Sequence, residues 1–289
     1  MKFLGPDSDE RLLIADEVGV GKTIEAGIII DELISRGDIK HNDAIMIVCP
    51  SVLCTKWKKE LRNKFLMDDF YIHDGKTLSF LLNEIKETGK IHYVHSIVSE
   101  QLFRGEKYQE LLKECLEERG EAFFGLLIVD ECHHYRNVGT NTNKFGKLLS
   151  LCSDRVVMLS ATPFNLRSDD FYNQLHMLNP TLFPEQSVFN QLLKQIRNVN
   201  KSISLLKKDD AKSRSNLILL VDQLKIIAEQ NQYIASEFMN IYNKIVTGEV
   251  LSIKEKVDFE KLLEKLNPIS SSFTRTLKRD AIEHRVTRE

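Results

Sequence analysis

Residues 12–23 combine a short apolar run with a glycine-containing loop that ends in Gly21-Lys22-Thr23. A triphosphate needs many hydrogen-bond donors at once, and a tight loop followed by a helix N-terminus supplies them from backbone N–H groups. Lys22 has the length and charge to reach β- and γ-phosphates, and the Thr23 hydroxyl suits Mg²⁺. The predicted phosphate-binding residues are Asp16, Glu17, Val18, Gly19, Val20, Gly21, Lys22 and Thr23.

The loop departs from the general pattern G-x-x-x-x-G-K-[ST], because Asp16 occupies the position of the first glycine. On this motif alone, a tight glycine turn before an ordinary helix stays an alternative. The rest of the chain has to decide between the two interpretations.

A second acidic group follows the most apolar run of the chain, residues 123–129. Phosphate chemistry needs carboxylates near the metal and the attacking water. Asp130 is predicted to bind Mg²⁺, and Glu131 to orient or deprotonate that water, so that Lys22, Asp130 and Glu131 form the predicted catalytic set. An acidic pair that only caps the next turn is the alternative.

Two histidines, His133 and His134, follow the acidic pair without the i, i+4 spacing of a metal site on a helix. We interpret His133 as a coupling residue that hydrogen-bonds to Ser160 or Thr162 in the segment Ser160-Ala161-Thr162. Surface histidines without a role are the alternative.

Strand and helix signals alternate through the first two thirds of the chain, which predicts an α/β fold with a mostly parallel, doubly wound sheet and helices on both faces. Expected strands are the apolar run that begins at residue 12, then 44–49, 70–73, 91–95, 123–129 and 155–160; expected helices are 23–35, 53–65, 78–87, 108–119 and 143–151. Ligands of such sheets gather at the carboxyl ends of the strands. The loop, Pro50-Ser51, Asp130-Glu131 and the 160–162 segment all follow strands, so they are expected along one edge.

From about residue 184 the strand signals end, and helical periodicity continues to residue 266. The expected domains are 1–183, an all-helical insertion or appendage at 184–272 with a polar helix–helix connection at 207–216, and a basic segment at 273–289. Residues 1–185 carry a net charge of −7, and residues 186–289 carry +5. A charge of this size on a helical region is typical of a solvated surface, and contact with DNA is the weaker interpretation.

Composition is that of an ordinary globular protein, with 42% hydrophobic and 28% charged residues. The chain shows no leader and no membrane-spanning run, so we expect a cytoplasmic protein. Its five cysteines form no C-x-x-C pair, which favours buried, reduced thiols over a metal site.

Three motifs in this order resemble the Swi/Snf branch of helicase superfamily two. They are residues 16–27, Asp130-Glu131-Cys132-His133 and the segment 159–164. That branch carries aspartate where Asp16 stands. The segment 16–27 is most similar to bacterial members, the RapA-like RNA polymerase recyclers and remodeller-type ATPases of phage-defence systems. The resemblance implies a RecA-like P-loop lobe, the first of two, that binds ATP and Mg²⁺ and hydrolyses ATP.

The resemblance also implies duplex DNA as a partner and translocation that remodels protein–DNA complexes or acts in phage defence. Segments similar to motifs Ia and Ib place the expected DNA-backbone contacts at Pro50, Ser51, Lys56 and Ser96. No membrane partner is expected, whereas the helical region could bind a protein.

The chain begins close to the phosphate loop and ends where the first lobe of this family ends. A glutamine motif upstream of the loop is therefore not expected, and the second lobe, in cis or on another chain, would supply the arginine finger. Such a finger is worth on the order of 10³–10⁵ in rate, so the chain alone is expected to be nearly inactive. Two other functions stay open: the motor lobe of a restriction-type or true helicase, and a nucleotide- or partner-binding module without catalysis.

Overall fold

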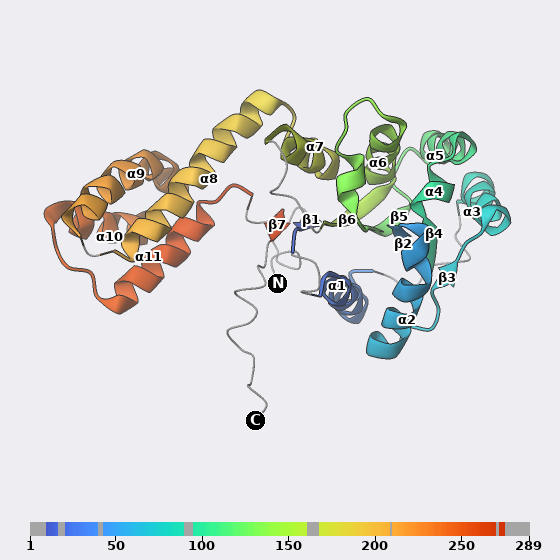
Figure 1. Cartoon of the computed structure of the whole chain (residues 1–289), viewed down its shortest axis with the longest axis horizontal. Helices are drawn as coiled ribbons and strands as arrows, with labels where there is room; N and C mark the ends of the chain where they lie inside the picture. Colours follow the sequence, from blue (N-terminus) through green and yellow to red (C-terminus); the bar gives the residue numbers. More distant parts are fainter. Residues whose placement is uncertain are drawn as a thin grey trace. The chain divides into compact units, whose positions relative to one another are not determined.

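The computed structural model describes residues 10–16, 21–39, 43–89, 95–160, 168–208, 210–269 and 272–274. These residues divide into two units: Glu185–Ser270 forms one, and the rest of the described chain forms the other. The first unit contains the sheet and those predicted site residues that the structure describes, whereas the second is helical (Figure 1).

The first unit is built on one seven-stranded sheet in the order β3-β4-β2-β5-β6-β1-β7. Its strands are β1 (Arg11–Ile14), β2 (Ala44–Cys49), β3 (Tyr71–Ile72), β4 (His95–Ser99), β5 (Phe124–Val129), β6 (Ser153–Leu159) and β7 (Phe273–Thr274). Every described strand pairing is parallel. The predicted α/β fold with a parallel sheet is therefore confirmed.

Helices cover both faces of the sheet, with α1 and α2 on one side and α6 and α7 on the other (Figure 1). The helices of this unit are α1 (Lys22–Arg36), α2 (Cys54–Phe65), α3 (Gly75–Thr88), α4 (Glu100–Phe103), α5 (Glu106–Arg119), α6 (Asn141–Leu151) and α7 (Ser168–Leu178). All side chains of β2 and β5 are buried, as expected for central parallel strands covered on both faces. One core forms where Ile47 and Ile128 of these strands meet Ile30 of α1 and Leu61 of α2.

Strand β7 was not expected from the sequence, which assigned Phe273 and Thr274 to a basic segment outside the lobe. Instead the chain returns after the helical unit and pairs with β1. The Leu13 N–H donates to Ser272 O at 2.8 Å, and the Ala15 N–H donates to Thr274 O at 2.9 Å. The strand that leads into the phosphate loop thus has a neighbour on both sides.

The second unit contains α8 (Gln186–Leu206), α9 (Ala211–Gln230), α10 (Ala235–Thr247) and α11 (Ile253–Lys265). Its separate core includes Leu224, Phe238 and Phe259. The predicted connection at 207–216 is too long, because α9 begins at Ala211. Asp210 caps this helix by accepting a hydrogen bond from Ser213 N at 2.8 Å, which stabilises a polar first turn that carries no apolar signal.

The other predicted elements lie within a few residues of their observed bounds, with one shift at β4. The strand expected at 91–95 lies at His95–Ser99, and residues 90–94 fall outside the described chain. Among the described helices, none has both the length and the apolar character that crossing a membrane requires.

Close packing of α1 on α2 makes Gly27 a test of the fold. A Cβ at Gly27 would lie 2.2 Å from Cε2 of Phe65. Alanine in a helix is normally more stable than glycine by about 0.5–1 kcal/mol. Here the clash with Phe65 makes alanine destabilising instead of stabilising. We expect Gly27→Ala to lower the free energy of unfolding by about 1–3 kcal/mol, as measured in urea titrations.

The double variant Gly27→Ala, Phe65→Leu removes the ring tip and should recover most of that loss. A Gly27→Ala protein as stable as the wild type would contradict this packing of α1 against α2.

Candidate functional site

Polar residues follow the ends of four neighbouring strands, and parallel pairing brings these ends to one edge of the sheet. Asp16 follows β1, Pro50 follows β2, Asp130 follows β5 and Ser160 follows β6. The structure thus brings together the strand ends that the sequence predicted to meet. Glu17, Val18, Gly19, Val20, Ala161 and Thr162 lie outside the described residues.

Gly21 ends the phosphate-loop segment and begins α1. Its φ of 116° is left-handed backbone that favours glycine, and its carbonyl accepts hydrogen bonds from Ile24 N and Glu25 N. The N–H groups that open a helix have no partner within it, so the first turn of α1 offers donors and a positive dipole end beside Lys22 and Thr23. The start of a helix with free N–H donors is suited to binding an anion.

Lys22 reaches back toward the end of β1, where its Nζ donates to the Asp16 carbonyl at 3.0 Å. The Asp16 residue is fully buried, and its carboxyl shares a hydrogen bond with Glu25. Burial first, and then the Asp16 carboxyl, raise the pKa of Glu25 to about 7. Sequence reasoning gave Glu25 no role; its position three residues after Lys22, in the first turn of the predicted helix, was the only available signal.

Asp130 lies at the end of β5 and is only 7% exposed. Its Oδ2 accepts a hydrogen bond from Trp57 Nε1 at 2.9 Å, and its Oδ1 accepts one from Glu131 N at 2.9 Å. Burial raises the pKa of Asp130, whereas the Trp57 hydrogen bond and the charge of Lys22 lower it. Trp57, the only tryptophan in the chain, lies in the helix predicted at 53–65, and sequence reasoning did not identify it as a hydrogen-bond donor.

Glu131 has a left-handed backbone, with φ of 52° and ψ of 42°. Such a conformation in a non-glycine residue costs about 1–3 kcal/mol and persists only where the surroundings hold it. Its Oε2 lies 3.1 Å from Nδ1 of His133, and this hydrogen bond is the largest cause that lowers the pKa of Glu131. Lys22 lowers it as well, so Glu131 is set up as a charged carboxylate.

His133 contacts Glu131 in the described structure, and Cys132 hydrogen-bonds to Ser160. Cys132 is fully buried and lies 3.8 Å from Oε1 of Gln174. Cys132 therefore makes one link between the acidic motif and the end of β6, and the coupling role of His133 stays a prediction. The predicted alternative partner of His133, Thr162, lies outside the described residues.

The four expected DNA contacts fall into two groups. Ser51 and Lys56 are exposed and Pro50 is half-buried, so all three can reach a ligand at this edge. The prediction for Ser96 is wrong, because its side chain is buried inside β4 and its hydroxyl hydrogen-bonds to Nε2 of His73 at 3.0 Å. A strand position surrounded by the sheet leaves this hydroxyl no path to a DNA backbone.

The raised pKa of Glu25 predicts a pH-dependent stability difference. Because the folded pKa lies above the ordinary value of 4.5, the unfolded chain loses this proton first as pH rises, and stability falls between about pH 4.5 and 7. Glu25→Gln should therefore gain stability over the wild type across this range and keep the gain above about pH 7 in chemical unfolding titrations.

The matched control is Glu32→Gln on the same helix, whose side chain is 42% exposed. Its exposed pair with Arg36 is worth at most about 1 kcal/mol, so Glu32→Gln should change stability by no more than that at pH 7. A Glu25→Gln difference that is independent of pH would contradict the buried pairing of Glu25 with Asp16.

Comparison with known proteins adds three findings. The model of the SNF2-related domain matches residues 7–268. The RNA polymerase-associated protein RapA of Photobacterium profundum is 27% identical over 222 residues, which are 75% of this chain and 22% of that protein. RapA of Yersinia enterocolitica is 29% identical over 199 residues, 68% of this chain and 19% of that protein.

The chain thus spans about a fifth of the length of these relatives. Among solved structures, the Sulfolobus solfataricus SWI2/SNF2 ATPase core in complex with dsDNA aligns with a TM-score of 0.47 at 14% identity, covering 92% of this chain and 74% of that chain. On the strength of the family match, which takes in most of its length, this chain belongs to the SNF2-related domain family.

Proposed function

We propose that this chain is the ATP-binding lobe of a DNA-dependent ATPase and translocase that remodels protein–DNA complexes. The observation that carries the proposal is the convergence of Lys22, Asp130 and Glu131 at one edge of the sheet. The charge of Lys22 favours the ionised form of both carboxyl groups, as expected for groups at the same edge. A lysine facing two carboxylates at a helix N-terminus suits a magnesium-bound triphosphate.

The residues present fit ATP and Mg²⁺. Gly21 holds the left-handed turn that exposes the first N–H groups of α1, and Asp130 is a buried carboxylate whose raised pKa a bound cation would lower. Thr23 and Asp130 would hold the ion, and Lys22 would bind the outer phosphates. ATP supplies the phosphoryl group whose transfer to water drives translocation.

Glu131 has the position and charge to orient the attacking water. The His133 hydrogen bond fixes its carboxylate and keeps it ionised, and the left-handed backbone sets its direction. Orientation of a nucleophile by a rigid carboxylate contributes through geometry more than through basicity. The hydrolytic step also needs a second RecA-like lobe with its arginine finger, in cis or on another chain.

Duplex DNA is the proposed partner at the same edge, where Pro50, Ser51 and Lys56 would contact its backbone without reading sequence. The RapA relatives are by name associated with RNA polymerase, and a protein partner for the helical unit Glu185–Ser270 is a further part of the proposal.

Lys22→Ala tests the phosphate loop. Loss of the ammonium should weaken binding of Mg²⁺-ATP to this chain by at least about tenfold, the size of one charge-assisted contact. Isothermal titration calorimetry measures it directly, with Lys59→Ala on the exposed surface of α2 as a control that should bind as the wild type does. Unchanged affinity in Lys22→Ala would refute the assignment of the loop.

Glu131→Gln tests the division of labour between binding and turnover. The amide keeps the size of the side chain but cannot act as a charged base or water-orienting carboxylate. We expect nucleotide affinity within about twofold of the wild type and a loss of turnover on the order of 10²-fold or more when the second lobe is present. Normal hydrolysis by Glu131→Gln would remove this residue from the proposed role.

A further inference from the structure

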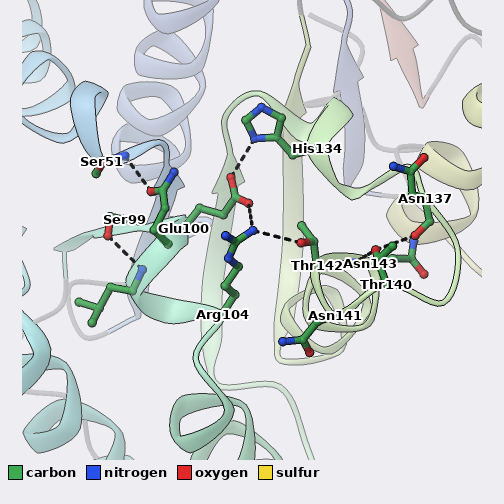
Figure 2. Close-up of polar contacts among 12 residues, drawn as sticks. Ser51, Ser99, Glu100, Arg104, His134, Asn137, Thr140, Asn141, Thr142 and Asn143 are labelled. Atoms are coloured by element: carbon green, nitrogen blue, oxygen red, sulfur yellow. Dashed lines mark hydrogen bonds and ion pairs between the residues drawn. The ribbon is translucent and has the colours of Figure 1, made fainter.

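A buried acid outside the proposed catalytic set lies beside it at the end of β4. Glu100 opens the short helix α4 and is 2% exposed. Its Oε2 lies 3.0 Å from Nδ1 of His134, and its Oε1 lies 3.6 Å from a guanidinium nitrogen of Arg104 (Figure 2). A carboxylate is expensive to bury unless it is paired, and here two cationic or donor groups share it.

The His134 contact leads directly to the catalytic carboxylate. His134 belongs to the turn Cys132–Tyr135 that follows Glu131. Its ring packs edge-to-face on His133, with 4.5 Å between centroids, and His133 in turn holds Glu131 at 3.1 Å. Glu100 therefore reaches Glu131 through two packed rings and two hydrogen bonds. Since the backbone of Glu131 is left-handed, it depends on such supports to stay in place.

The next residue of α4, Gln101, contacts a different loop. Oε1 of Gln101 accepts a hydrogen bond from the backbone N–H of Ser51 at 3.0 Å. Ser51 is exposed and begins the turn between β2 and α2, one of the proposed DNA contacts. Figure 2 shows both contacts leaving the same short helix, Ser51 on one side and His134 on the other.

Arg104 anchors this helix to a third element, since its guanidinium donates to Oγ1 of Thr142 in α6 at 3.2 Å. Beside these groups lies a polar hollow of about 370 Å³. It is lined by Glu100, Gln101, Arg104, His133, His134, Arg136, Asn137 and Thr142. On this side the turn faces the hollow and is held by polar contacts, whereas Cys132 and Tyr135 of the same turn are buried in the core.

We propose that Glu100 is a positioning residue for Glu131, and that Gln101 on the same helix ties the Ser51 loop to the catalytic turn. The inference rests on the proposed ATPase function. A shift of the Ser51 loop on DNA contact moves α4 through Gln101, and Glu100 passes the shift to His134 and so to the carboxylate. This gives a physical path by which DNA at one loop changes hydrolysis at the next.

The test compares three variants and one control. Each is assayed with the second lobe present, with and without duplex DNA. Glu100→Ala should lower kcat by about 10- to 100-fold, the cost of a misplaced catalytic group, with KM for ATP within about twofold. Glu100→Gln retains an acceptor for His134 and should recover much of this loss. Gln101→Ala should keep the DNA-independent kcat but lose about fivefold or more of the DNA stimulation.

The control is Glu110→Gln, an exposed acid on α5 whose kinetics should match the wild type. Should Glu100→Ala not fold, His134→Ala removes the other end of the same contact at a residue with an exposed side chain, and the same fall in kcat is expected. If the wild type hydrolyses ATP and Glu100→Ala or His134→Ala keeps the wild-type kcat, the positioning role of Glu100 is refuted while the proposed function stands. If Gln101→Ala keeps the full DNA stimulation, the proposed tie between the Ser51 loop and the catalytic turn is refuted.

A second readout needs no activity. In this chain alone, Glu100→Ala should speed amide hydrogen exchange in residues 131–136 by about tenfold or more, while exchange in β5 and β6 stays slow. Unchanged exchange in 131–136 would overturn the inference even if the ATPase assay failed. A wild-type protein that never hydrolyses ATP would instead overturn the proposed function, and the exchange result would still decide the contact.

Discussion

Parallel strand direction is the constraint on which the site depends. Every described pairing in the seven-stranded sheet is parallel, so each strand delivers its next residue to the same edge. Asp16, Pro50, Asp130 and Ser160 are far apart in the chain, and no local interaction would bring them together. Side-chain hydrogen bonds then connect the segments that follow neighbouring strands. Trp57 in α2, which follows β2, donates to Asp130, which follows β5.

The two carboxylates of the acidic motif differ because their surroundings differ. Burial raises the pKa of Asp130, so a cation nearby would stabilise its charged form. The His133 hydrogen bond instead lowers the pKa of Glu131 and keeps that carboxylate charged. Adjacent acids pushed in opposite directions are typical of sites where each has its own task. Lys22 acts on both and connects the phosphate loop with this pair.

Sequence reasoning succeeded where the signal is local. Strand β2 was predicted with its observed bounds, because a continuous apolar run closed by Pro50 is characteristic of a central parallel strand. The loop and the acidic pair were proposed because phosphate chemistry demands their residue types, and their roles stay predictions. Strand β7 could not be found in this way, since two residues at 273–274 become a strand only by pairing with β1.

The misses at the site have the same physical origin. Ser96 was assigned to DNA from a motif, but burial depends on which residues a strand turns toward its neighbours. Glu25 and Glu100 look like ordinary helix acids until folding places Asp16 beside one and His134 beside the other. Partners more than thirty residues apart, such as Glu100 and His134, leave no periodic trace.

The central claim is that this chain holds one half of an ATPase site. The most direct measurement is ATP hydrolysis by the chain while a polypeptide carrying the second RecA-like lobe is titrated in, with and without duplex DNA. We predict almost no turnover by the chain alone, and turnover that rises with the second lobe and rises further with DNA. Full turnover without the second lobe, or none at any concentration of it, would contradict the account.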